Sequence, residues 1–312
     1  MSKELPLETL STSERPPKIE KNISEVEKEA YRFLIPKHRE LGIRLEEFED
    51  IYGPEEIERD LRSIEKKRAK MDGLDSALYK RAQLLEAILA EQIELSDWFG
   101  EKVMTIVPSE YDDLFNGIDL TAEFEKEGSY QYMAMGIDVT SSANPVRKKL
   151  EIIKQHIKDE TLTQMKYFKS ERNDIQGRFG KIPQLLIGAD ARTINELSDL
   201  WLTVHKSRHS GKDLNRSELE ELKQKAKEAQ EKLANHRTAM LILEELREQL
   251  NIFAQFAEKN NSLETAEKYR NLLKLVEKAI QTKHVSLAEQ KYNESDDVYK
   301  SIKNELGGFL AE

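Results

Sequence analysis

The sequence predicts an α+β protein, with a central mixed β-sheet flanked by helices and with helical regions on both sides of it along the chain. Three observations indicate this class. Charged residues make up 35% of the 312 residues, a composition that suits long solvated helices. Apolar residues recur every three or four positions in both outer parts of the chain, which is helical spacing. Eight of the thirteen glycines lie between Gly100 and Gly211, among runs with the alternation of β-strands.

Two regions precede the predicted sheet. Residues 1–17 are polar and end at a proline pair, a composition typical of a disordered tail. Residues 18–84 predict an N-terminal helical region, because apolar residues recur at helical spacing while prolines and glycines divide the pattern into separate helices. The last of these helices is expected to begin near Asp75, an N-cap residue type, and to run to about Phe99.

A second helical region, residues 211–312, follows the predicted sheet. Its leucines form a heptad-like stripe that glutamine, asparagine and histidine interrupt, so a helical hairpin or bundle is favoured over a long coiled coil. Helices are expected over 215–259, 263–283 and 285–306. The two helical regions are the parts through which the chain would contact a protein partner or form a homodimer.

Residues 85–210 predict the α/β core. From Ile118 to Glu125, apolar and polar residues alternate with the period of a β-strand. Pro145 suits the first turn of a helix whose apolar stripe extends to Ile157. The expected strands cover 103–107, 118–125, 130–140, 164–168 and 182–187, and a further helix is expected over 193–204.

The composition excludes several functions. The chain has no cysteine, which excludes disulfides, thiolate metal sites and cysteine nucleophiles. It contains no P-loop, dinucleotide-binding glycine motif, HExxH zinc motif or G-x-S-x-G turn. The formal net charge of -10 argues against nucleic acid coating the whole surface. A polar amino terminus and the absence of long apolar runs predict a cytoplasmic protein that does not contact a membrane.

Two aspartates interrupt strand-like segments of the predicted core. They are Asp119, in the run Gly117-Ile118-Asp119-Leu120, and Asp138, in the run Gly136-Ile137-Asp138-Val139-Thr140. A buried carboxylate is costly unless it is paired, protonated or bound to a metal. On neighbouring strands, Asp119, Asp138 and the backbone carbonyl of Val139 would form the oxygen-rich environment that Mg²⁺ or Mn²⁺ prefers. These three residues are the predicted metal ligands.

Cationic residues that follow the second aspartate add to this prediction. Lys149 lies on the flank of the next helix, from which it could reach the two carboxylates. From Arg147 to Lys181, ten lysines and arginines accompany five acids, a local charge of +5 that suits a polyanionic ligand. The residues expected to contact nucleic acid are Lys148, Lys166, Lys169 and Arg172.

With these residues, the segment 85–205 resembles the PD-(D/E)xK phosphodiesterases, a superfamily that includes many restriction and repair nucleases. The motif of this superfamily places an aspartate at the start of the second core strand, where Asp119 stands, and an acid-x-lysine in the third, where Asp138 stands. Thr140 occupies the lysine position. Some members move the lysine to the adjoining helix, and Lys149 would be that residue.

The resemblance implies a restriction-endonuclease-like mixed sheet and a Mg²⁺- or Mn²⁺-dependent nuclease that cleaves phosphodiester bonds, of DNA in preference to RNA. The implied catalytic residues are Asp119, Asp138 and Lys149. Glu91 or Glu94, on the preceding helix, would match the additional acid that some members use.

Three alternatives remain open from the sequence. Asp113, in a loop expected before the second strand, is a rival for the first acid. If Lys149 does not reach the site, the domain would be an inactive, nuclease-like module that binds nucleic acid without cutting it. The chain could also be a non-catalytic helical scaffold or assembly protein, because more than half of it is predicted as amphipathic helix. The convergence of Asp119, Asp138 and Lys149 in the fold separates these functions.

Overall fold

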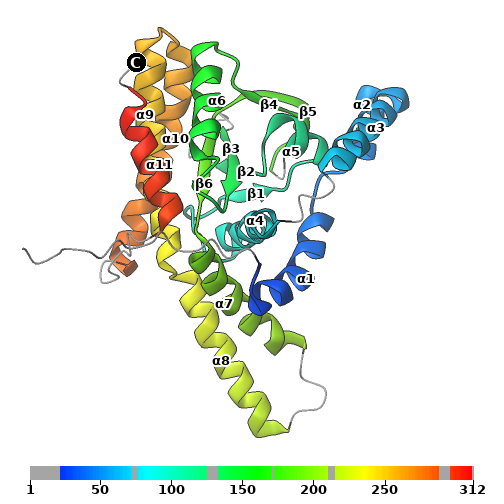
Figure 1. Ribbon diagram of the computed structural model, residues 1–312, viewed down its shortest axis with the longest axis vertical. Helices are drawn as coiled ribbons and strands as arrows, with labels where there is room; N and C mark the ends of the chain where they lie inside the picture. The colour runs from blue at the N-terminus through cyan, green and yellow to red at the C-terminus, as the bar shows by residue number, and fades with distance from the viewer. Residues whose placement is uncertain are drawn as a thin grey trace, which may run out of the picture.

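The computed structural model is α+β, as expected, and describes residues 22–71, 76–124, 133–170, 172–209, 215–287 and 296–310 (Figure 1). The predicted disordered tail 1–17, the N-cap predicted at Asp75 and the beginning of the strand predicted from Tyr130 lie outside these residues. Every helix within the described ranges is too short or too polar to cross a lipid bilayer.

A four-stranded mixed sheet lies at the centre of the molecule. Its strands follow the order β1-β2-β3-β6; the first three pair antiparallel, and β6 runs parallel to β3. A parallel pair needs a long crossover, and here the crossover contains helix α6. The bounds are β1 (Met104–Ile106), β2 (Leu120–Phe124), β3 (Met133–Thr140), α6 (Val146–Lys158) and β6 (Gln184–Gly188).

A second, two-stranded sheet forms within the crossover. β4 (Thr163–Lys169) pairs antiparallel with β5 (Gln176–Ile182). The strand expected near 164–168 is therefore present, but it does not belong to the main sheet. The sequence does not predict β5, because Gly177, Gly180 and charged residues interrupt the strand pattern.

Helices surround the main sheet and share one hydrophobic core with it. Helix α4 contacts β1 and β3, whereas α6, α9 and α11 pack on β6. In Figure 1 the helices α9, α10 and α11 stand together beside α6 and β6, while α8 projects from the body. The helical region predicted over 211–312 thus completes the core of the sheet. The bounds are α1 (Glu25–Glu40), α4 (Ala77–Leu95), α7 (Ala191–His209), α8 (Arg216–Ala234), α9 (Arg237–Lys259), α10 (Leu263–Leu287) and α11 (Asp297–Gly308).

The prediction of a single helix over 215–259 is wrong. The chain breaks between Ala234 and Arg237, and the imidazole of His236 caps α9 by accepting from the amide of Thr238. This break lets α9 turn onto the edge strand β6. There Gln249 donates through Nε2 to the Leu186 carbonyl at 2.7 Å and accepts from the Leu186 amide at 2.9 Å. An amide side chain thereby covers part of an edge that would otherwise favour aggregation.

An N-terminal arm, residues 45–71, lies against the core on the side of β4. The arm consists of the short 3₁₀ helix η1 (Leu45–Phe48), α2 (Glu49–Tyr52) and α3 (Pro54–Met71). Phe48 and Ile57 of the arm share a buried apolar cluster with Tyr167 of β4. The arm is therefore packed against the core and is not an independent unit.

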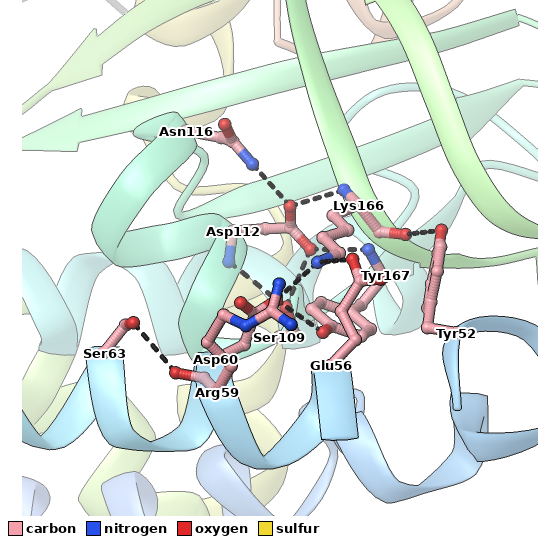
Figure 2. Close-up of polar contacts among 10 residues, drawn as sticks. All are labelled: Tyr52, Glu56, Arg59, Asp60, Ser63, Ser109, Asp112, Asn116, Lys166 and Tyr167. Atoms are coloured by element: carbon pink, nitrogen blue, oxygen red, sulfur yellow. Dashed lines mark hydrogen bonds and ion pairs between the residues drawn. The ribbon is translucent and has the colours of Figure 1, made fainter. Parts of the chain in front are cut away.

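Lys166 ties the arm to the core (Figure 2). Its ammonium binds the carboxylates of Glu56 and Asp60 in α3, the second at 2.6 Å. The hydroxyl of Tyr167 donates to the same Asp60 oxygen at 2.7 Å, and that of Tyr52 donates to the Lys166 carbonyl at 2.7 Å. Removing one partner of such a buried network leaves an uncompensated charge, so the network fixes the position of the arm.

Asp112, on a helix that the sequence does not predict, fixes the strand that carries Lys166. This helix is α5 (Glu110–Asn116). The Asp112 carboxylate accepts from the backbone amides of Lys166 at 2.7 Å and Tyr167 at 3.0 Å, and from Nδ2 of Asn116 at 2.6 Å (Figure 2). Because all of these groups are largely buried, no water replaces the carboxylate if it is removed.

We expect Asp112→Ala to lower the free energy of unfolding by about 3 kcal/mol, because two buried amides each lose an acceptor at about 1–3 kcal/mol apiece. Urea denaturation followed by circular dichroism measures the change. The matched control is Asp199→Ala, which removes a solvent-exposed carboxylate on helix α7. Equal losses in the two variants would contradict the role given to Asp112.

Candidate functional site

Asp119 and Asp138 meet at the junction of β2 and β3. The backbone amide of Asp119 donates to the Ile137 carbonyl at 2.9 Å, which places Asp119 beside Asp138. Its carboxylate accepts from the Val139 amide at 2.6 Å. The carboxyl of Asp138 is hydrogen-bonded to that of Asp119. Sheet register therefore brings together two acids that are nineteen positions apart in the sequence.

Lys149 reaches the same point from helix α6. Its ammonium is bonded to the Asp138 carboxylate and lies 3.3 Å from the Val139 carbonyl. The side chain of Asp138 is 14% exposed and that of Lys149 is 27% exposed, so solvent reaches both. The structure thus joins Asp119, Asp138 and Lys149 in one site.

Two further acids, Glu86 of α4 and Asp113 of α5, border Asp119. Asp113 is hydrogen-bonded to Asp119, and Glu86 lies close enough for the Asp119 charge to act on it. Gly117 ends α5 with a φ of 66°, a conformation that suits glycine and turns the chain back so that Asp113 and Asp119 meet. Glu86, Asp113, Asp119 and Asp138 are called the carboxylate cluster below.

His38 of α1 supports Glu86. Its Nε2 lies 2.7 Å from Oε1 of Glu86, within hydrogen-bond distance. Burial lowers the pKa of His38 to about 4, so the imidazole is neutral at pH 7 and contributes no positive charge to the cluster. Lys149 is thus the cation that acts on the described acids Asp119 and Asp138. Its ammonium is hydrogen-bonded to Asp138, and its positive charge acts to lower the pKa of Asp119.

The carboxyls of the cluster bind their protons more tightly than free carboxyls do, because burial disfavours their charged forms. Burial raises the pKa of Asp138 to about 7; the Asp119 carboxylate acts in the same direction and Lys149 opposes both. Burial also raises the pKa of Asp119, against the ammonium of Lys149 and the amide of Val139. The pKa of Glu86 is raised well above its ordinary value by burial and then by Asp119.

The pKa of Asp113 is raised in the same way, although Asp113 is more exposed than the other acids of the cluster. Burial of its carboxyl raises its pKa, as do the charges of Asp119 and Glu86. The residue as a whole is nevertheless exposed, because it faces a cavity that solvent enters. The carboxyls of Glu86, Asp119 and Asp138 belong to residues that are less exposed than Asp113.

A cavity of about 860 Å³ opens onto the cluster. Glu86, Asp113 and Asp119 form part of its wall on the side of the core, and His38 lies near them. The opposite wall is built by the end of α1, the segment after it and the N-terminal arm. A ligand in this cavity would therefore contact Glu86, Asp113 and Asp119 directly, whereas Asp138 and Lys149 lie behind Asp119 and do not line the cavity.

Glu86, and not the predicted Glu91 or Glu94, is the acid of α4 that borders Asp119. Glu91 accepts from Nε1 of Trp201 at 2.6 Å, and Glu94 accepts from the Thr105 amide at 2.9 Å. At about 100° per residue, Glu91 lies about 140° around the helix from Glu86. The signal in the sequence is a single acid inside the apolar run Leu84 to Leu89. His38 carries no comparable signal.

The residues predicted to bind nucleic acid do not form one patch. Lys166 is buried in the network that holds the arm, so its prediction as a nucleic-acid contact is wrong. Lys169 pairs with Glu47 of the arm at 2.6 Å, and Arg172 donates to the Lys102 carbonyl. Lys148 is exposed on α6. Lys166, Lys169 and Arg172 therefore bind groups of this chain, which leaves less of the positive charge of the segment for an external ligand.

Thr140 does not take the place of a catalytic lysine. The residue is buried, and its hydroxyl donates to the Ser142 carbonyl at 3.1 Å and accepts from the Ser142 amide at 3.3 Å. These bonds shape the turn between β3 and α6. Thr140 thereby helps to direct the helix that carries Lys149.

The described acids are not pre-arranged as a complete metal site. Across the parts of the chain that the structure describes, no three histidine, aspartate or glutamate side chains are grouped so as to hold a metal ion. The carboxyls instead bond to one another, to the Val139 amide and to Lys149. Their donor atoms are all oxygens, the type that Mg²⁺ and Mn²⁺ prefer.

Comparison with known proteins adds no assignment: no protein-family model, curated protein or solved structure matches the chain. The interpretation of the site therefore depends on its own geometry and charge.

The raised pKa of Asp138 predicts a pH-dependent stability. A carboxyl with a pKa of about 7 in the folded protein binds its proton more tightly there than in the unfolded chain, where the pKa is about 3.9. The resulting stabilisation is complete below the unfolded pKa and is lost as the pH rises through the folded pKa. Relative to Asp138→Asn, wild type should lose at least about 1.4 kcal/mol, the value of one pKa unit, between about pH 5 and pH 8.

Urea unfolding of both proteins across this pH range measures the effect. Asp174→Asn, which changes an exposed aspartate, is the control and should follow wild type. Parallel curves for wild type and Asp138→Asn would show that Asp138 has an ordinary pKa in the folded protein.

Proposed function

We propose that the chain is a metal-dependent nuclease that hydrolyses phosphodiester bonds of nucleic acid, with DNA favoured over RNA. The observation that carries this proposal is the meeting of Asp119, Asp138 and Lys149 at one solvent-accessible point. The order of helix α4, three antiparallel strands, α6 and a parallel strand supports it, since a restriction-endonuclease-like core has this order of elements.

The charge of the carboxylate cluster fits a divalent cation. One ammonium, that of Lys149, contacts a group of acids whose pKa values are raised by burial and, for Asp138 and Glu86, also by the charge of Asp119. A cation that binds oxygen ligands would supply the missing positive charge. Asp119, Asp138 and the Val139 carbonyl would hold it, and Glu86 and Asp113 lie next to them.

In the proposed reaction, the chain orients the reacting groups. Bound Mg²⁺ or Mn²⁺ would stabilise charge at phosphorus and lower the pKa of an attacking water. The Val139 amide holds one oxygen of Asp119 in place. Lys149, bonded to Asp138 and close to the Val139 carbonyl, presents its ammonium where it can donate to a phosphate oxygen or to the attacking water.

The grouping of several buried acids disfavours a purely structural role for this part of the chain. A scaffold would gain stability if several neighbouring buried acids were replaced by apolar residues, because poorly compensated buried carboxylates are destabilising. Groups of neighbouring buried acids with raised pKa values are typical of functional sites. The direct contact between Lys149 and Asp138 likewise favours catalysis over nucleic-acid binding alone.

We expect wild type to cleave nucleic acid in the presence of Mg²⁺ or Mn²⁺, and not after chelation. Asp138→Ala should abolish cleavage, because it removes a ligand of the cation, and Lys149→Ala should slow it by at least about 100-fold. Lys158→Ala changes an exposed lysine of the same helix and should leave the rate unchanged. Gel analysis of end-labelled substrates measures all three. Undiminished cleavage by Asp138→Ala would reject the assignment.

Metal binding can be measured without catalysis. Mg²⁺ or Mn²⁺ should raise the unfolding temperature of wild type, since a ligand at one hundred times its Kd stabilises the folded state by about 2.7 kcal/mol. The Asp119→Ala/Asp138→Ala double variant should lose this shift. NaCl at matched ionic strength is the control for screening. An equal shift in the double variant would place the cation elsewhere.

A further inference from the structure

The cavity beside the carboxylate cluster also bears on the form of the substrate. We infer that this site acts on a single polynucleotide strand and excludes an intact duplex, an inference that rests on the nuclease function proposed above. It follows from the shape of the cavity, the fixed position of the arm and the chemistry of the walls.

The cavity is enclosed from two sides. Its core wall includes Asp113 and Asp119, and its outer wall includes Leu45 of η1 and Ile64 of α3. Its volume of about 860 Å³ lies within the range of about 300–1,000 Å³ that is usual for pockets that hold small molecules. This space suits nucleotide-sized groups, and a strand would enter it a few nucleotides at a time.

The arm is fixed in this position by contacts at several points. Besides the Lys166 network, Nζ of Lys67 donates to the Leu114 carbonyl at 2.7 Å. Nε2 of Gln176 donates to the Glu47 carbonyl at 3.0 Å. These bonds join both the start and the end of the arm to the core. The outer wall is therefore part of the packed structure and does not open as a free lid.

A duplex would not reach the cluster past this wall. Double-stranded DNA is stiff, and bending it sharply over about 20–30 base pairs costs free energy. A duplex therefore presents its phosphates along the side of a thick, nearly straight rod unless that cost is met. The rod would have to displace the arm to bring that phosphate to Asp119. A single strand bends freely and can lead its backbone into the cavity, as in other channels that bind single strands.

The walls offer contacts for both parts of a nucleotide. Ile43, which is partly exposed, provides apolar surface, and the exposed ring of Tyr79 lines the same cavity. Aromatic rings stack on bases whatever the sequence. The lining of the cavity holds three arginines and six acids, and two of the arginines pair with acids of the same wall, Arg44 with Glu46 and Arg68 with Glu110. Arg39 is exposed on the wall and its charge acts on Glu86, so it is the lining cation placed to bind a phosphate close to the cluster.

Cleavage by wild type in Mg²⁺ tests this inference with four labelled substrates: single-stranded DNA, single-stranded RNA, blunt duplex DNA and the same duplex with a single-stranded overhang. We expect single strands to be cut at least ten times faster than the blunt duplex, and the overhang to be cut within its unpaired part. The DNA and RNA arms identify which strand chemistry the cavity prefers.

Arg39→Ala tests the role of the wall. It should raise KM for single strands several-fold with a smaller change in kcat, and Arg39→Lys should restore part of the loss. Arg62→Ala is the matched control, because Arg62 is an exposed arginine of α3 that pairs with Glu58 at 3.2 Å and does not line the cavity. Thermal unfolding checks that each variant is folded.

The outcomes separate the two proposals. Cutting of blunt duplex as fast as single strands, or equal KM values for wild type and Arg39→Ala, would overturn the single-strand inference while the nuclease function stands. Failure to cut any substrate in Mg²⁺ or Mn²⁺ would overturn the nuclease function, and the inference with it.

Discussion

The contact between Lys149 and Asp138 is the interaction on which the site depends. It places one ammonium among acids that would otherwise repel one another at the end of two strands. Charges so close together are tolerated only where the surrounding fold fixes them. Sheet register fixes Asp119 against Val139, and the turn shaped by Thr140 directs α6 so that its lysine reaches β3. The fold thus supports an arrangement that is locally unfavourable.

The rest of the molecule can be understood as support for this arrangement. Helix α4 packs on the sheet and brings Glu86 to the cluster, while α9 and α11 cover β6 on the far side of β3. The N-terminal arm forms a wall of the cavity and is held by Lys166, a buried cation with its own acids. Two separate groups of charges therefore have different roles: the one around Lys166 is compensated and structural, and the one around Lys149 is not fully compensated.

Sequence patterns predict the regular part of this structure well. Apolar–polar alternation marks β2, strand-like runs mark β1 and β3, and the Pro145 signal with its apolar stripe marks α6. Strands β2 and β3 are buried at nearly every position, on both faces, whereas α6 buries one face. Helix α5 and strand β5 escape prediction, since both are short and polar and owe their form to tertiary bonds such as those of Asp112. Asp119, Asp138 and Lys149 can be found because motif and strand period agree. Glu86 cannot be chosen over Glu91 without the rotation of α4, and the burial of Lys166 depends on where the arm packs.

The central claim is that the carboxylate cluster holds a divalent cation for phosphodiester hydrolysis. The most direct measurement is Mn²⁺ titration followed by electron paramagnetic resonance, with wild type compared with Asp119→Asn and Asp138→Asn. The account predicts that wild type binds Mn²⁺ in a protein site whose signal each substitution removes. Mn²⁺ that remains free in solution with wild type, or that binds equally well to both variants, would contradict it.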